Sequence, residues 1–193
     1  MFSILFLYTI CNIWLLELEK RNSMKKIVFT GPECSGKSTL SKALAKKFNL
    51  PLVKEYAREY LNQIGQSYTY DDLVTIAKAQ LKLETEHINL NLHQPAIICD
   101  TNLQVIKIWS QAKYGKCDSF ILHNQDQNCL YILCKPDIKW IFDPLRENEN
   151  NRDELFEKYH NDLINNNLNF LVSEGTYAQR IQYLSENINK LIS

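Results

Sequence analysis

The octapeptide "GPECSGKS", residues 31–38, is the feature that most constrains how this chain can fold. It follows directly on the apolar run 27–29 and leads into the amphipathic run 38–48, which predicts a strand before the glycines and a helix after them. Glycines allow a tight turn whose backbone N–H groups point inward at a helix N-terminus, where an anion is favoured. The spacing therefore favours a phosphate-binding loop over the alternative, an ordinary glycine turn.

This loop predicts ATP and Mg²⁺ as cofactors. In the pattern Gly-x-x-x-x-Gly-Lys-Ser the lysine, here Lys37, reaches the β- and γ-phosphates, and the serine hydroxyl, here Ser38, holds Mg²⁺. The residues expected around the phosphates are Gly31, Glu33, Cys34, Ser35, Gly36, Lys37 and Ser38.

Short apolar runs alternate with longer amphipathic runs along the rest of the chain. Strands are expected at 26–30, 50–56, 95–100, 129–134 and 169–173. Helices are expected at 38–48, 57–64, 70–92, 103–114, 118–127, 153–167 and 177–192. Such alternation implies a parallel sheet that is covered by helices on both faces. We therefore expect one domain with a three-layer α/β fold of the P-loop NTPase and nucleoside-kinase type, with a five-stranded parallel sheet and a lid segment.

Two acidic residues are candidates for chemistry at the edge of this sheet. Asp100 closes the apolar run 95–100, and ligands gather at the carboxyl ends of parallel strands, so Asp100 is expected to hold Mg²⁺ together with Ser38. The alternative for Asp100 is a helix cap. Glu55 follows the short strand 52–54 and is a candidate general base for a substrate hydroxyl, with a solvated loop glutamate as the alternative. The choice between Asp100 and Glu55 as base stays open at this level.

The polar stretch 135–152 is expected to form the lid. It contains Pro136 and Pro144 and carries Arg146 and Arg152. A guanidinium that arrives when a lid closes stabilises the charge of a phosphoryl-transfer transition state, and closure excludes water. Both arginines are therefore candidate catalytic residues, although each alone is also compatible with an ordinary surface position.

From about Lys25 to the last helix, the chain resembles the ribosylnicotinamide kinase domain of NadR, which is grouped with the AAA-type P-loop ATPases. The segments that carry the resemblance are "GPECSGKSTL" (31–40), "KEYAREYL" (54–61), "AKAQLKLE" (77–84), "CDTN" (99–102) and "LCKPDIKWIFDPLRENENNRDELF" (133–156). The last of these is the most specific, because its aromatic, acidic and arginine positions recur at fixed spacing.

The resemblance implies ATP-dependent phosphorylation of the 5′-hydroxyl of nicotinamide riboside, which gives nicotinamide mononucleotide in NAD salvage. It adds Thr39 to the residues on the phosphates, and it places Tyr56, Arg58, Trp140 and Asp143 around the riboside. A cationic pyridinium ring would stack on an aromatic face and favour a nearby carboxylate. The alternatives are core packing for Tyr56 and a loop anchor for Trp140.

The chain departs from the family pattern at two positions. Cys34 stands where serine is usual, and Asn102 stands where a second acid is common, which weakens the case for two carboxylates sharing the metal. Two other functions stay open: a kinase for another nucleoside, and a regulatory P-loop ATPase without a small-molecule acceptor.

Amino-acid composition indicates which partners and which cellular compartment are expected for the protein. Lys plus Arg and Asp plus Glu both number 22, and such balanced charge argues against a nucleic-acid partner. The cysteines form no Cys-x-x-Cys pair, so we expect a reduced, cytoplasmic protein, with a homo-oligomer as an open possibility. Within residues 1–23, the stretch 1–16 carries no charge and is apolar over about fifteen positions, too few for a membrane span of about twenty. We expect residues 1–23 to be a mistaken upstream start, with a real apolar helix as the alternative, and residues 24–193 to be the kinase domain.

Overall fold

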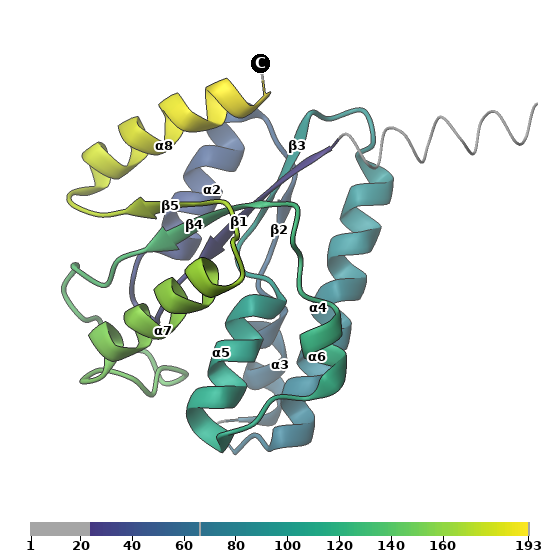
Figure 1. Ribbon diagram of the computed structural model, residues 1–193, viewed down its shortest axis with the longest axis vertical. Coiled ribbons are helices and arrows are strands. Elements are labelled where there is room, and N and C mark those ends of the chain that lie inside the picture. Colours follow the sequence, from purple (N-terminus) through teal and green to yellow (C-terminus); the bar gives the residue numbers. More distant parts are fainter. Residues whose placement is uncertain (1–23, 66, 193) are drawn as a thin grey trace, which may run out of the picture.

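The computed structural model describes residues 24–65 and 67–192, and the proposed extension 1–23 lies outside the described residues. A parallel five-stranded sheet of order β2-β3-β1-β4-β5 forms its centre (Figure 1). The strands are β1 (Lys25–Thr30), β2 (Leu52–Val53), β3 (Ala96–Cys99), β4 (Leu130–Cys134) and β5 (Phe170–Ser173). This confirms the predicted fold class.

Helices cover both faces of the sheet because its strands are apolar on both sides. On one face, α2 (Lys37–Phe48) and α8 (Tyr177–Ile192) pack on β1 residues such as Ile27 and Phe29. On the other face, α4 (Tyr70–Leu90), α5 (Leu103–Tyr114) and α7 (Arg152–Asn165) pack on residues such as Val28 (Figure 1). Ile27, Val28 and Phe29 have no exposed surface, as expected for a central strand with side chains on alternate faces.

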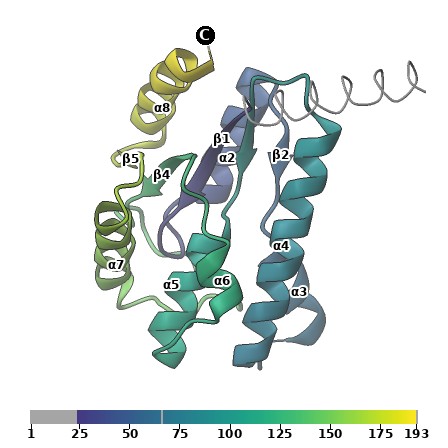
Figure 2. The same cartoon turned by 45° about the vertical axis from the view of Figure 1, so that its right-hand side comes forward.

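A third apolar cluster, besides those on the two faces of the sheet, extends the fold beyond the carboxyl ends of the strands. It joins α3 (Tyr56–Ile64), α6 (Ser119–His123) and parts of α4 and α5, and it includes Leu61, Leu73 and Ile121 (Figures 1 and 2). These helices therefore form a wall facing the edge of the sheet at which the strands end.

The strand register places the candidate residues at that one edge. Val28 of β1 pairs with Cys99 of β3 and with Tyr131 of β4, and Val53 of β2 also pairs with Cys99. Consequently the segments that follow β1, β2, β3 and β4 leave the sheet on the same side. These segments carry the phosphate loop (residues 31–38), Glu55, Asp100 and the start of the lid.

Most element boundaries lie within two residues of the sequence-based expectation, and three elements differ in ways worth noting. Strand β2 contains two residues instead of the expected 50–56, because Pro51 has no N–H to donate and α3 already begins at Tyr56. Helix α6 is shorter than the expected 118–127, and α7 begins at Arg152, one residue before the expected start.

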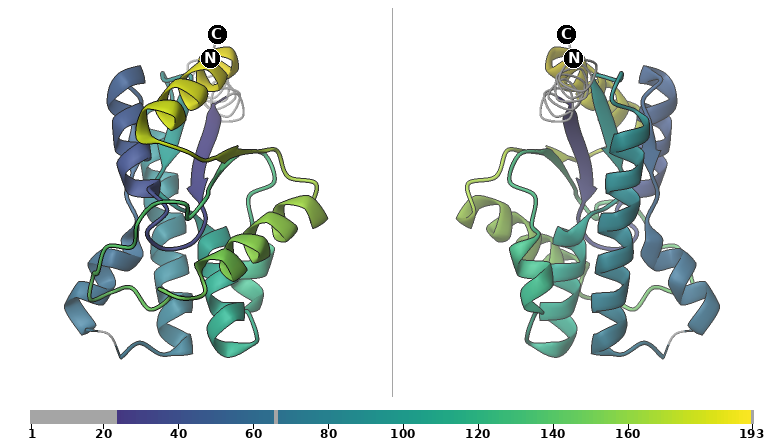
Figure 3. Two further views of the ribbon diagram at one scale, coloured as in Figure 1. Left: turned by 90° about the vertical axis from the view of Figure 1, so that its left-hand side faces the viewer. Right: turned by 90° about the vertical axis from the view of Figure 1, so that its right-hand side faces the viewer.

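The lid segment, residues 135–151, connects β4 to α7 without a helix or strand. It crosses in front of the phosphate loop on its way from the sheet to α7 (Figure 3, left). Its tip is fixed by a turn in which Arg146 N donates to Asp143 O (3.0 Å) and Leu145 N to Asp143 Oδ1 (3.0 Å). The irregular stretch expected from the sequence is therefore present and lies against the candidate site.

Two further expectations concern the environment of the protein. In residues 24–65 and 67–192, no helix combines the length and apolar character that a membrane crossing requires. The five cysteines of that part of the chain are all free thiols; they are Cys34, Cys99, Cys117, Cys129 and Cys134.

Candidate active site

The phosphate loop owes its shape to residues with positive φ. Gly31 (φ 122°) leaves β1 so close to β4 that a Cβ at this position would lie 2.6 Å from the carbonyl oxygen of Cys134. Cys34 (φ 50°) and Gly36 (φ 92°) are also left-handed, and Gly36 is the N-cap of α2. Left-handed residues alternating with others turn successive N–H groups to one side, which makes an anion-binding concavity at the helix N-terminus.

Gly31→Ala is expected to lower the free energy of unfolding by about 3 kcal/mol, because it adds a clash with backbone to an unfavourable φ. The matched control is Gly115→Ala at the C-cap of α5, which has φ 67° but no atom within 4 Å of the added Cβ. The free energy of unfolding of the control should fall by only about 1 kcal/mol, which is the cost of the left-handed φ without a clash. Urea unfolding of both variants measures the difference, and equal losses would show that the approach to Cys134 is unimportant.

Lys37, the first residue of α2, lies back over its own loop. Its Nζ donates to the carbonyl oxygens of Gly31 (2.8 Å) and Pro32 (2.7 Å), so the ammonium lies at the mouth of the concavity. A cation in this position can interact with a phosphate chain that lies on the loop amides.

Asp100 lies directly behind the loop, at the end of β3. Its residue surface is 4% exposed, and its Oδ1 has no hydrogen-bond partner. Burial raises the pKa of this carboxyl, while the Ser38 hydroxyl and the charge of Lys37 act in the opposite direction. A buried carboxylate oxygen without a donor, beside a serine hydroxyl, fits the oxygen ligands that Mg²⁺ prefers.

The metal would have to take its other ligands from elsewhere. Among residues 24–65 and 67–192 there is no group of three or more His, Cys, Asp or Glu side chains that could hold an ion. Mg²⁺ usually keeps several waters and binds through one or two carboxylates together with substrate phosphates. The pair Ser38 and Asp100 is therefore a suitable protein contribution for Mg²⁺ bound together with a nucleotide.

Asn102, where the family commonly has an acid, has a structural role in this chain. Its Oδ1 accepts from Gln104 N (3.0 Å) and so caps α5, and its Nδ2 donates to the hydroxyl of Tyr131 (3.2 Å). The preceding residue, Thr101, has φ 97°, which is a strained value for a β-branched residue. Such strain concentrates at functional sites, and here it lies next to Asp100.

Glu55 is the second acid at this edge of the sheet. It precedes α3, is half-buried, and contributes to the wall of a cavity that begins at the phosphate loop. Burial raises the pKa of its carboxyl, the charge of Lys37 opposes the rise, and the charge of Asp100 adds to it. A carboxylate with a raised pKa is a better proton acceptor near neutral pH than an ordinary glutamate.

A cavity of about 550 Å³ runs from the phosphate loop to the helical wall, a volume suited to a small-molecule ligand. At one end it is lined by residues 31–39 of the loop and first turn of α2, Thr39 included, and by Glu55. At the other end it is lined by Arg58 and Leu61 of α3, Trp109 and Lys113 of α5, and residues 145–148 of the lid.

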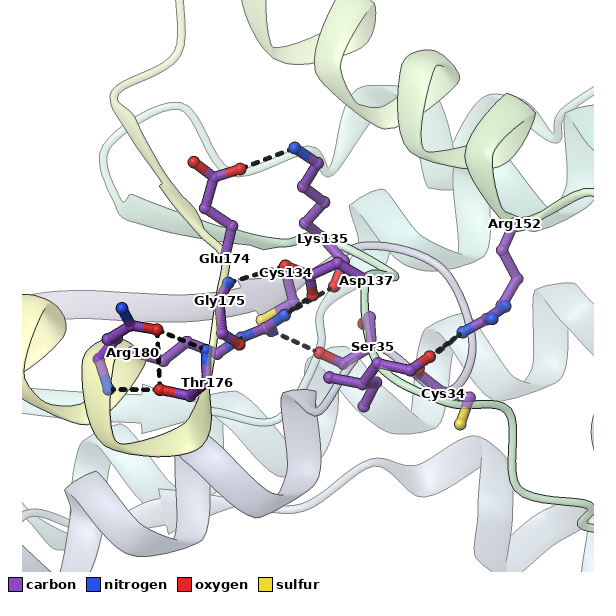
Figure 4. Close-up of polar contacts among 12 residues, drawn as sticks. Cys34, Ser35, Cys134, Lys135, Asp137, Arg152, Glu174, Gly175, Thr176 and Arg180 are labelled. Atoms are coloured by element: carbon purple, nitrogen blue, oxygen red, sulfur yellow. Dashed lines mark hydrogen bonds and ion pairs between the residues drawn. The ribbon is translucent and has the colours of Figure 1, made fainter.

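The lid is held against the phosphate loop by polar contacts. The Glu33 carboxylate accepts from the backbone N–H groups of Glu147 and Asn148, both at 3.0 Å. Arg152 donates from Nη1 to the carbonyl oxygens of Cys34 (3.2 Å) and Ile138 (3.1 Å), and the first of these contacts is drawn in Figure 4. Ile141 N donates to Cys34 Sγ (3.4 Å), so the thiol contacts the lid backbone.

The two arginines expected in the lid lie in different places, Arg146 in the lid and Arg152 at the start of α7. Arg146 lines the cavity and donates to the carbonyl oxygen of Ile141. The guanidinium of Arg152 lies outside the cavity wall, on the loop carbonyl, and its Nε is buried without a hydrogen-bond partner. The Trp140 ring lies against both guanidinium groups, 5.7 Å from Arg146 and 5.4 Å from Arg152.

Of the four residues expected around the acceptor, only Arg58 lines this cavity. Asp143 forms an ion pair with Arg58 (3.0 Å), and Trp140 stacks on the lid arginines. Tyr56 packs with its ring centroid 6.2 Å from that of Tyr60, and its N–H donates to Gln80 Oε1 (2.9 Å). Their roles with substrate stay predictions.

The cavity also contains residues that sequence reasoning missed. Trp109 donates from Nε1 to the hydroxyl of Tyr68 (2.7 Å), which donates to the carboxylate of Glu147 (2.6 Å) in the lid. Lys113 Nζ lies 3.6 Å from the Tyr68 ring centroid and 3.1 Å from Glu147 Oε1. In the sequence, Trp109 has the spacing of an ordinary apolar helix face, so no local signal marks it as a cavity wall.

A parallel sheet with a phosphate loop between its first strand and the following helix defines the P-loop class of α/β proteins. Within this class the chain belongs to the AAA-domain family, whose sequence profile matches residues 26–180. A comparison with curated protein sequences found no match.

Solved structures with the same fold include two of NadR. NadR in complex with nicotinamide riboside (NR) superposes with a TM-score of 0.77 at 19% identity, over 92% of this chain and 53% of that chain. NadR in complex with NAD and AMP-PNP gives 0.71 at 21% identity, over 91% and 52%. This chain thus spans about half the length of the NadR chains, and the predicted resemblance to NadR is confirmed at the level of the fold.

Two other similar structures are kinases of different substrates. Deoxyadenosine kinase from M. mycoides gives a TM-score of 0.64 at 18% identity, over 86% of this chain and 99% of that chain. Thymidylate kinase from Ehrlichia chaffeensis gives 0.61 at 17% identity, over 89% and 100%. At such identities the similarity concerns the fold, and the substrate has to be argued from the site.

Proposed function

We propose that this protein is a cytoplasmic kinase of NAD salvage that transfers the γ-phosphoryl group of ATP to the 5′-hydroxyl of nicotinamide riboside. The observation that carries the proposal is a continuous cavity of about 550 Å³ that joins the phosphate loop to the wall formed by α3, α5 and the lid. Such a cavity can hold a triphosphate and a nucleoside-sized acceptor end to end. The fold shared with NadR in complex with nicotinamide riboside supports this choice of acceptor.

The binding half of the mechanism belongs to the phosphate loop. Its inward N–H groups and the Lys37 ammonium would hold the β- and γ-phosphates, and Ser38 with Asp100 would hold Mg²⁺. When bound, Mg²⁺ neutralises charge on the phosphate oxygens. Arg146, which lines the cavity from the lid side, is placed to stabilise the charge that develops on the transferred group.

The acceptor half of the mechanism needs a base, and we assign this role to Glu55 rather than Asp100. Glu55 lines the cavity, whereas Asp100 is not among the described residues that line it. Glu55 would take the proton of the acceptor hydroxyl as the hydroxyl oxygen bonds to the γ-phosphorus. The bond from that phosphorus to the bridging oxygen breaks at the same time, and ADP carries away the electron pair.

Glu55→Gln is expected to lower kcat by about 10²-fold, the usual contribution of a positioned general base. In the wild type the rate should fall as the pH falls through the raised pKa of Glu55, and this dependence should disappear in the variant. Because the fold disfavours the ionised form, Gln should also raise the free energy of unfolding at neutral pH. The matched control is Glu59→Gln, which removes an exposed carboxylate from the same helix.

Parallel pH profiles of kcat and urea unfolding curves measure both effects. If Glu55→Gln keeps the wild-type rate and pH profile, the base is another group.

The acceptor is tested by measuring ADP formation with a panel of acceptors. Nicotinamide riboside, deoxyadenosine and thymidine offer a hydroxyl, and thymidine monophosphate offers a phosphate. We expect nicotinamide riboside to stimulate ADP formation most strongly and to be converted to the mononucleotide. Strong turnover with a deoxynucleoside instead would identify a kinase of that nucleoside, an alternative that the fold of deoxyadenosine kinase supports. Slow hydrolysis that no acceptor stimulates would point to a regulatory ATPase.

A further inference from the structure

Arg180, in the first turn of α8, is a buried cation that the mechanism above does not use. Its side chain is 3% exposed, and its guanidinium donates in three directions. Nη1 donates to the carbonyl oxygen of Ser35 in the phosphate loop (2.9 Å), and Nε to that of Gly175 (2.9 Å). Nη2 donates to the carbonyl oxygen of Lys135 (3.1 Å) and to the carboxylate of Asp137 (Figure 4).

The contact with Ser35 bears directly on how the phosphate loop presents its amides. All peptide bonds of the described residues are trans, and in a planar trans peptide the C=O and N–H groups point in opposite directions. Arg180 is not one of the described residues that line the cavity, while Ser35 and Gly36 are. With the Ser35 carbonyl held on the side of Arg180, the N–H of Gly36 is therefore turned toward the cavity.

A second arginine acts on the adjacent peptide in the same way. Arg152 donates to the carbonyl oxygen of Cys34 (3.2 Å), so two consecutive peptides of the loop have their carbonyls fixed by guanidinium groups (Figure 4). These two peptides lie between the left-handed residues Cys34 and Gly36, just before α2 begins at Lys37. Without such donors their orientation would be free to change.

Arg180 also connects the phosphate loop to the start of the lid. Lys135 and Asp137 are the first and third residues of the lid segment, and Asp137 Oδ2 also accepts from Gly175 N (2.7 Å). Through these hydrogen bonds, the guanidinium of Arg180 links the phosphate loop, the start of the lid and the turn before α8. A buried ion pair adds little to net stability compared with apolar packing, so a positioning role accounts for the arginine better than stability alone.

We propose that Arg180 is a positioning residue that orients the Ser35–Gly36 peptide so that its N–H faces the bound phosphate. This inference rests on the proposed function, because it requires a nucleotide phosphate on the loop. The inference predicts that loss of the Arg180 side chain weakens binding of the nucleotide and leaves binding of the acceptor unchanged.

The test compares Arg180→Met and Arg180→Lys with Lys190→Met, which removes an exposed cation from the other end of α8. Calorimetry measures the Kd of ADP with Mg²⁺, and steady-state kinetics measure the KM of ATP and of the acceptor. For Arg180→Met we expect the Kd of ADP and the KM of ATP to rise about 30-fold, the scale of charge-assisted hydrogen bonds. The KM of the acceptor should change by less than about twofold, and Lys190→Met should match the wild type.

Arg180→Lys keeps the charge but lacks the planar fork, so it should recover only part of the affinity. Asp137→Asn keeps the arginine and removes its carboxylate partner, so it should raise the Kd of ADP more weakly than Arg180→Met does. These two variants carry the test if Arg180→Met does not fold.

A structural role alone would lower the melting temperature and the active fraction but leave the KM of ATP unchanged. That result, or a folded Arg180→Met that binds ADP like the wild type, would overturn the inference. Lys37→Ala distinguishes a wrong role for Arg180 from a wrong proposed function. If Lys37→Ala weakens the binding of ADP and the Arg180 variants bind ADP as tightly as the wild type, only the role of Arg180 is wrong. If the wild type itself binds no nucleotide, the proposed function falls and this inference falls with it.

Discussion

Lys37→Ala is expected to lower kcat/KM for ATP by about 10³-fold while the protein stays folded. The ammonium lies over the mouth of the loop, 2.8 and 2.7 Å from the carbonyl oxygens of Gly31 and Pro32. It is thus the cation best placed to contact the β- and γ-phosphates, and removing one preorganised charge of this kind costs about 10²- to 10³-fold in rate. Loss of binding adds to that effect.

The variant should remain folded because Lys37 is half-buried and contributes only two hydrogen bonds to its own loop. Each such bond contributes about 1 kcal/mol to stability. Initial rates over a range of ATP concentrations, with circular dichroism melts alongside, measure the two effects separately. Lys46→Ala, an exposed lysine on the same helix, is the matched control and should behave as the wild type. A Lys37→Ala protein with more than a tenth of the wild-type activity would contradict the mechanism.

Asp100→Asn is expected to lower kcat by about 10³-fold and to raise the Mg²⁺ concentration needed for half-maximal activity, because a metal-ligating charge is lost. The same variant should be more stable than the wild type at neutral pH. Burial raises the pKa of Asp100 above its value in the unfolded chain, so the fold disfavours the ionised form. The ionised carboxylate therefore costs stability at pH above the raised pKa, and the cost disappears as the pH falls below the unfolded value.

Urea unfolding at pH 7 and under acidic conditions, together with Mg²⁺ titrations of activity, tests both parts of this prediction. The stability difference between Asp100→Asn and the wild type should shrink as the pH falls. An Asp100→Asn variant that is active with the wild-type Mg²⁺ requirement would refute a metal role for this carboxylate, whatever its stability.

The fold could be predicted from the sequence because its strongest signals are local. Short continuous apolar runs such as 27–29 and 96–99 favour strands that are buried on both faces, and the amphipathic runs between them give the covering helices. Strand β2 is the element that the sequence specifies least, since a two-residue edge strand beside Pro51 is fixed by pairing with β3.

The candidate site could be predicted only where its residues follow strand ends. The loop 31–38, Glu55 and Asp100 are positioned by the sheet, so their grouping follows from topology. The far wall of the cavity depends on contacts across the chain, such as Tyr68 with Glu147, which are 79 residues apart. The side chains of Arg152 and Trp140 likewise take partners set by the path of the lid, and no spacing rule specifies that path.

The central claim is that the concavity around Gly36, with the Lys37 ammonium beside it, binds the phosphate chain of ATP. Calorimetric titration of the purified protein with ATP in the presence of Mg²⁺ tests it most directly. The account predicts saturable binding of one nucleotide per chain that Lys37→Ala weakens. No detectable heat and no binding of ATP by the wild-type protein would contradict it.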